Sequence, residues 1–141
     1  MKRDSYHYGD LKQDLLNEAL VQLKIIGYEK LSFRKVAKKL GVASSAPYNH
    51  FKSKKDLIEK IITEGKKKLI NHMKIDLSFS DSPSEKIFNI AKNYFNFAVI
   101  EKELFDLMFS ETNSNLEILI QEIVLQFEEV VIEKFRMGKR I

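Results

Sequence analysis

The chain has 141 residues, of which 44% are hydrophobic and 31% charged, a composition typical of a folded globular protein rather than a disordered one. It contains no cysteine, which excludes disulfide bonds, thiolate nucleophiles and thiolate metal sites. No segment approaches the roughly 18 consecutive apolar residues that cross a bilayer, so we expect a cytoplasmic protein with no part in the membrane.

The net charge of +4 is divided unevenly along the chain. Residues 1–75 contain 17 Lys and Arg against 8 Asp and Glu, a balance of +9, whereas residues 76–141 contain 7 against 12, a balance of −5. A basic first half indicates contact with a polyanion such as nucleic acid. Lysines also solubilise ordinary helix surfaces, so the charge alone leaves both interpretations open.

In chain order, the first segment has the apolar spacing of a helix. Five residues recur at every third or fourth position and predict one buried face: Leu11, Leu15, Ala19, Leu23 and Ile26. Asp10 and Gln13 have the spacing of a capping box, and Gly27 predicts the end of this helix.

A second, short helix is predicted for Phe33–Leu40, with Ser32 as its N-cap and Gly41 as its left-handed stop. A third short segment, Ser44–His50, follows. A longer helix is then predicted from an N-cap at Ser53 to about Lys74.

The serine-rich stretch Leu77–Ser84 lies where the charge balance changes sign and predicts a domain boundary. Ser82-Pro83-Ser84-Glu85 combines a capping box with proline at the first helical position, which predicts a helix to about Ile100. A short helix over Leu104–Ser110 and a last helix from Ser114 to about Phe135 complete the pattern.

We therefore expect an all-α fold in which a three-helix bundle with a helix-turn-helix precedes a helical regulatory domain. The expected parts are a head at residues 1–52, a connecting helix at residues 53–75 and a regulatory domain at residues 76–141.

The second and third segments have the properties of a DNA-reading helix-turn-helix. Two short helices joined by a tight glycine turn can leave the second helix free to enter the major groove. The segment Ser44–His50 is made of small or polar residues and has little reason to be buried. Because proline is tolerated only in the first turn of a helix, Pro47 predicts either that Ser44 caps this helix or that the helix lacks one hydrogen bond.

These residues also resemble a known family. Gly41-Val42, Tyr48, His50-Phe51, Ser53-Lys54 and Leu57 are similar in identity and spacing to the recognition-helix signature of TetR/AcrR regulators. Gly27-Tyr28, Leu31-Ser32, Arg34 and Val36-Ala37 resemble the family's approach to its second helix. Tyr6–Leu11, Ala46-Pro47-Tyr48 and the region Phe95–Phe109 resemble a subgroup with a WHG-type C-terminal domain.

The resemblance implies a set of DNA-binding residues: Ser32, Arg34, Ser44, Ser45, Ala46, Pro47, Tyr48, Asn49, His50 and Lys54. Tyr48, His50 and Lys54 correspond to phosphate contacts, and Ser32 can donate to a phosphate as well as cap its helix. Asn49 can pair with the N6/N7 edge of adenine, and the methyl group of Ala46 can contact a thymine methyl group.

Several roles remain open. Tyr48 can instead be a half-buried packing residue, and Lys54 a solvated lysine. Arg34 can reach a base or only a phosphate. Asn49 stands where the family commonly has a basic or histidine side chain, and Lys2 and Arg3 form either a mobile DNA-binding arm or a disordered terminus.

The second half resembles the start of the family's effector domain. Five residues are candidates for lining a ligand cavity: Tyr94, Phe95, Phe105, Met108 and Phe109. The same residue types also form ordinary cores. The last predicted helix is apolar on nearly every side and needs cover all round. Family members usually continue with two more helices, so we expect either a truncated chain or a divergent short form, with this domain incomplete.

The sequence thus predicts a repressor that binds a near-palindromic double-stranded operator as a homodimer and is released by an unknown small-molecule effector. The alternative is a DNA-binding protein without such a ligand that acts through a protein partner. The three histidines lie far apart, and no phosphate-binding glycine loop or nucleophile motif is present, so we expect neither an enzyme nor a metal or cofactor site.

Overall fold

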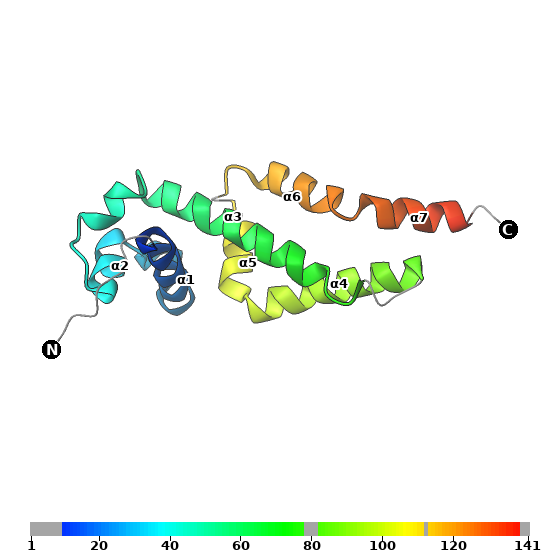
Figure 1. The fold of residues 1–141 in the computed structure, drawn as a ribbon, viewed down its shortest axis with the longest axis horizontal. Helices are drawn as coiled ribbons and strands as arrows, with labels where there is room; N and C mark the ends of the chain where they lie inside the picture. Colours follow the sequence, from blue (N-terminus) through cyan, green and yellow to red (C-terminus); the bar gives the residue numbers. More distant parts are fainter. Residues whose placement is uncertain (1–9, 78–81, 112, 139–141) are drawn as a thin grey trace. The chain divides into compact units, whose positions relative to one another are not determined.

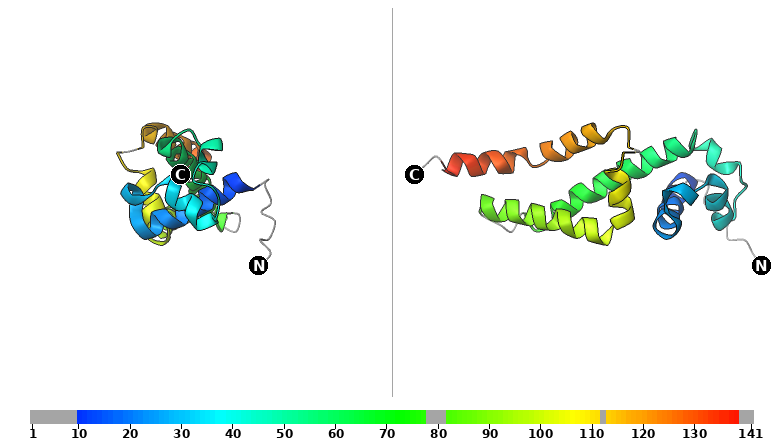
Figure 2. Two further views of the ribbon diagram at one scale, coloured as in Figure 1. Left: turned by 90° about the vertical axis from the view of Figure 1, so that its left-hand side faces the viewer. Right: turned by 180° about the vertical axis from the view of Figure 1, so that it is seen from behind.

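The computed structural model describes residues 10–77, 82–111 and 113–138, and Figures 1 and 2 show its fold. The described residues contain helices and no strand, so the predicted all-α fold is confirmed. The elements are α1 (Leu11–Lys30), α2 (Phe33–Leu40), the 3₁₀ helix η1 (Ala46–Asn49), α3 (Lys54–Met73), α4 (Pro83–Ile100), α5 (Lys102–Met108), α6 (Leu116–Leu125) and α7 (Glu128–Gly138). Among these residues, no helix has the length and apolar character needed to cross a membrane.

The chain divides into two compact units, Met1–Ile62 and Thr63–Ile141, so α3 contributes residues to both. The predicted arm at Lys2 and Arg3 and the Tyr6–Gly9 part of the family resemblance lie outside the described residues. Residues 78–81, in the middle of the predicted boundary, lie outside them as well.

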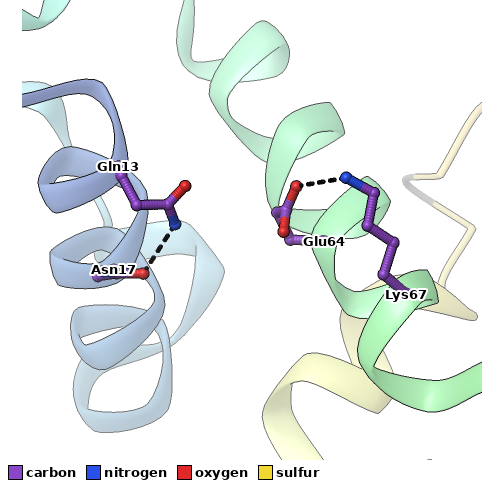
Figure 3. Close-up of polar contacts among 4 residues, drawn as sticks. All are labelled: Gln13, Asn17, Glu64 and Lys67. Atoms are coloured by element: carbon purple, nitrogen blue, oxygen red, sulfur yellow. Dashed lines mark hydrogen bonds and ion pairs between the residues drawn. The ribbon is translucent and has the colours of Figure 1, made fainter. Parts of the chain in front are cut away.

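The buried face of α1 follows the predicted spacing at four of its five residues, with Leu11, Leu15, Ala19 and Leu23 all in the core. The prediction is wrong for Ile26, which is only partly buried. Exposed polar residues on this helix pair locally, as Gln13 and Asn17 do at 3.1 Å (Figure 3). The expected capping box is wrong, because the Asp10 side chain makes no capping hydrogen bond.

Gly27 interrupts α1 as predicted, although helical residues continue to Lys30 beyond it. Its φ of 77° and ψ of 172° lie outside the helical region, in a conformation that L side chains rarely adopt. The chain therefore bends at Gly27, and a separate turn at residues 28–30 completes α1.

The two predicted ends of α2 are confirmed. Ser32 Oγ accepts a hydrogen bond from the Lys35 amide at 3.3 Å. At the other end Gly41 has φ 70° and ψ 25°, its amide donates to the Lys38 carbonyl, and the Val42 amide donates to the Ala37 carbonyl. This pair of bonds is a Schellman motif, which satisfies the last carbonyl groups of the helix.

In the second unit, α5 packs closely against the part of α3 that begins at Thr63. A methyl group added at Gly65 would lie 2.7 Å from Met108 Sδ and 2.9 Å from Leu104 Cδ1. On the exposed side of α3, Glu64 and Lys67 form an ion pair at 3.0 Å (Figure 3). α4 contacts both α5 and α7, and it begins at Pro83 and ends at Ile100 as predicted.

The predicted single last helix is wrong, since it is divided into α6 and α7, which follow one another with a break between them (Figure 2). At the break the amides of Gln126 and Phe127 donate to carbonyl groups three residues earlier. Phe127 is buried there while its neighbours Gln126 and Glu128 are exposed. The break lets this aromatic side chain reach the core, a requirement that the local apolar spacing does not reveal.

The predicted start of the last helix at Ser114 is also wrong, since α6 begins at Leu116. The buried Asn113 occupies this corner instead, with its Nδ2 donating to the Met108 carbonyl at 2.7 Å. Its Oδ1 accepts from the Asn115 amide at 3.0 Å. Asn113 thereby joins the end of α5 to the start of α6.

Candidate DNA interface

The predicted recognition helix is shorter and tighter than expected. Ala46–Asn49 forms a single 3₁₀ turn, and the predicted Ser44 cap is wrong because the structure starts this turn at Ser45, whose side chain makes no capping bond. The first bond of the segment runs from the Ala46 amide to the Ala43 carbonyl at 2.9 Å. Because Pro47 has no amide hydrogen, it cannot give the next bond of a regular α-helix.

Two buried side chains hold this turn on the head. Pro47 and Phe51 are both almost fully buried, and the Phe51 amide donates to the Pro47 carbonyl at 2.9 Å. The Phe51 ring lies 6.3 Å from the ring of Phe33, at the start of α2. Pro47 was included in the predicted DNA-contacting set, but its side chain belongs to the core and shapes the turn.

The remaining residues of the segment form its accessible face. Ser44, Ser45, Tyr48 and Asn49 are exposed, whereas Ala46 and His50 are partly buried. The turn thus offers small and polar side chains over a buried apolar base.

Tyr48 combines the two roles that the sequence left open. Its ring packs edge-on against Phe33 with centroids 4.8 Å apart, yet 63% of the residue is exposed. Such an arrangement fixes the ring while leaving the side chain accessible to a phosphate.

Lys54, at the start of α3, is tied to the end of α1. Its Nζ donates to the Tyr28 carbonyl at 2.7 Å and lies 4.5 Å from the centre of the Tyr28 ring. Lys35 Nζ donates in a similar way to the Lys30 carbonyl at 2.9 Å. Two lysines therefore satisfy carbonyl groups of the turn after Gly27, a structural role that sequence reasoning did not assign to Lys54.

The start of α3 is capped as predicted and more fully than expected. Ser53 Oγ accepts from the Asp56 amide at 3.1 Å, and Asp56 Oδ2 accepts from the Lys52 amide at 3.0 Å. The Ser-x-x-Asp spacing of Ser53 and Asp56 is typical of such a reciprocal cap, but only the part of Ser53 was predicted from the sequence.

Basic residues dominate α2, which contains no acidic residue. Arg34 is exposed, and Ser32 uses its hydroxyl as a helix cap. The first unit thus places cations on the helix that precedes the exposed turn.

In the second unit, four of the five predicted ligand residues come together. The Tyr94 ring lies 5.6 Å from Phe95, 5.4 Å from Phe105 and 6.3 Å from Phe109, and Phe105 and Phe109 are 4.6 Å apart. Burial raises the pKa of the Tyr94 hydroxyl above its ordinary value. We call these four residues the aromatic cluster. Met108 is fully buried near Gly65 instead.

Within the described residues, no three His, Asp or Glu side chains lie close enough together to hold a metal ion.

Comparison with known proteins bears directly on the first unit. Residues 15–61 match the family of bacterial regulatory proteins called the tetR family, a stretch that runs from α1 into α3. No curated protein matches the sequence.

Solved structures share the fold of most of the chain. A protein of unknown function from Rhodococcus sp. RHA1 is 24% identical, with a TM-score of 0.81 over 96% of this chain and 73% of its own. The TetR family transcriptional regulator PfmR from Thermus thermophilus is 21% identical, with a TM-score of 0.67 over 88% of this chain and 71% of its own. The fatty acid degradation regulator FadR from Bacillus halodurans is 18% identical, with a TM-score of 0.71 over 94% of this chain and 72% of its own.

The capped helix α2, the turn at Gly41 and the short helix η1 form a helix-turn-helix, the arrangement with which DNA-binding proteins enter the major groove. Residues 15–61 are similar to the tetR family of bacterial regulatory proteins, and solved structures that include a TetR family regulator share the fold of most of the chain. This similarity supports the predicted family resemblance for residues 15–61. The subgroup resemblance stays a prediction.

The contribution of the contacts between Lys54 and Tyr28 can be tested by measuring the stability of the folded protein. We expect Lys54→Met to lower the free energy of unfolding by about 1–2 kcal/mol, because it removes a charged hydrogen bond and a cation–π contact but keeps the aliphatic stem. Urea denaturation followed by circular dichroism measures this change. Lys55→Met, at an exposed neighbouring position, should stay within about 0.5 kcal/mol of the wild type. Equal stabilities of the two variants would show that these contacts contribute nothing.

Proposed function

We propose that the protein is a transcriptional repressor that binds a near-palindromic operator as a homodimer and is released by a small molecule. The observation that supports DNA reading most directly is the exposed turn at residues 44–49, anchored from below by Pro47 and Phe51. In a symmetric dimer, two such turns would enter major grooves separated by a whole number of helical turns.

The proposed contacts divide by chemistry. Tyr48, His50 and Ser32 carry donors for phosphate oxygens, and one donor of Lys54 can reach a phosphate while others hold the end of α1. The base-reading set consists of Ser44, Ser45, Ala46 and Asn49, all in or beside η1. Arg34 is assigned to the edge of the groove, where it contacts phosphate or guanine.

Binding to selected genomic fragments tests this function. We expect the full chain to select fragments whose half-sites are one DNA turn or a multiple of it apart. Because each bound phosphate releases counterions, affinity for these fragments should fall about 10³-fold or more between 50 and 200 mM salt. Affinity that stayed flat over this range, or fragments without paired half-sites, would contradict the proposed interface.

Asn49 tests how the interface reads sequence. We expect Asn49→Ala to change preference at one base pair by roughly 1–3 kcal/mol, because the amide can form a bidentate contact with adenine. Affinities for an operator and its single-base variants measure this effect. Tyr48→Phe keeps the ring on Phe33 and removes only the hydroxyl, so it should weaken binding to all variants alike. A uniform loss for Asn49→Ala would make Asn49 a backbone contact.

For the effector, we propose the aromatic cluster as the contact surface and α3 as the route to the head. The cluster offers several rings within about 6 Å of Tyr94, with Phe95 67% exposed. α3 carries residues of both units. An effector that binds more tightly to one orientation of α3 would therefore change the fraction of molecules that can bind DNA.

The competing possibility is regulation through a protein partner, and exposed apolar side chains on α4 favour it. Val99 and Ile100 are 80% and 68% exposed, respectively. Such surfaces are typical of protein–protein contacts.

Titration of the DNA complex with small apolar and cationic compounds separates the two possibilities. We expect at least one compound to release DNA from the wild type and to fail with Phe95→Ser, because the substitution removes a ring of the cluster. Phe88→Ser, at a similarly exposed position of α4 outside the cluster, should respond like the wild type. Equal responses of both variants would contradict the assignment to the cluster, and a lack of any release would favour the partner.

A further inference from the structure

The first unit has a groove between α1 and α2 that the proposed DNA contacts do not use. Its volume is about 460 Å³, and its lining residues are Gln22, Ile25, Ile26, Lys35, Lys38 and Lys39. We call it the α1–α2 groove.

Hydrogen bonds hold the two sides of this groove together. Gln22 Nε2 on α1 donates to the Lys35 carbonyl on α2 at 3.1 Å and to Glu18 Oε1 at 2.8 Å. Lys35 is itself fixed by its bond to the Lys30 carbonyl. The groove therefore exists before any partner binds.

The α1 side of the groove is apolar and open. Ile25 is 75% exposed, and Val21, one helical turn earlier, is 48% exposed. The core face of α1 is provided by other residues, including Leu15, Ala19 and Leu23. Exposed apolar side chains that are adjacent on one helix face, beside polar residues, are typical of a binding surface.

The α2 side is cationic. Lys38 and Lys39 are exposed, and neither has an ion-pair partner within the part of the chain that the structure describes. Glu18, the acidic residue near one end of the groove, accepts a bond from Gln22. Lys38 and Lys39 lie in the last turn of α2, where positive charge interacts favourably with the helix dipole. This interaction explains the lysines but not the exposed Ile25 beside them.

We propose that the α1–α2 groove binds an acidic amphipathic segment of a partner protein. An apolar side chain of the segment covers Ile25 and Ile26, and flanking carboxylates pair with Lys38 and Lys39. Charge complementarity selects an acidic occupant, and the apolar base selects a peptide over a DNA backbone, whose phosphates have nothing apolar to place on Ile25.

The test uses a synthetic helical peptide of about 18 residues with leucines one turn apart and glutamates beside them. Its binding to the full, isotope-labelled chain is followed by NMR. We expect shifts centred on the groove residues. Replacement of the leucines by serine, or of the glutamates by glutamine, should each weaken binding about tenfold or more.

Variants of the protein locate the site. Ile25→Ser and the double variant Lys38→Gln/Lys39→Gln should each weaken peptide binding about tenfold, and both change exposed side chains. The matched controls Ile75→Ser and Lys60→Gln should bind the peptide like the wild type, since both residues lie outside the groove.

Other results overturn the proposal. An unchanged peptide affinity in Ile25→Ser would show that the peptide binds through its charge alone. Chemical-shift changes centred outside the groove would show that it binds at another surface. If the peptide does not bind and the double lysine variant loses DNA affinity while Ile25→Ser retains it, the lysines are DNA contacts and the groove has no peptide partner.

Discussion

The burial of Pro47 and Phe51 holds the exposed turn of the head in place, and the proposed reading of DNA depends on it. The turn is one 3₁₀ segment of four residues, too short to be stable by itself. Its side chains keep a fixed direction because Phe51 packs near Phe33 and the Pro47 carbonyl accepts the Phe51 amide. The exposed side chains of the turn are therefore held in place by the core residues beneath them.

That core depends in turn on how the helices of the first unit end. Gly27 and Gly41 both have positive φ, and each lies at a change of chain direction. Lysine side chains bind the carbonyl groups exposed after Gly27, while a Schellman motif satisfies those before Gly41. Basic residues thus stabilise the fold as well as giving the unit its charge.

The sequence was sufficient for most helices and several caps, because periodicity and capping are local properties. Ser32, Gly41 and Ser53 act where their spacing placed them. Local patterns could not predict the hydrogen bond from Lys54 to the Tyr28 carbonyl, since the two residues are 26 positions apart.

The division of the last helix also depends on tertiary burial, in this case of Phe127, and not on the local pattern. For the candidate site, sequence identified the exposed residues of the turn but included Pro47, whose burial only the folded chain reveals.

The close packing at Gly65 has a consequence for evolution. The helix has no room for a methyl group there unless the side chains of Leu104 and Met108, both fully buried, give way. Homologues with a larger residue at this position therefore need smaller or differently placed side chains at the other two positions, or a wider separation of the helices. These three positions should vary together among related sequences, and their covariation would mark which relatives share this helix contact.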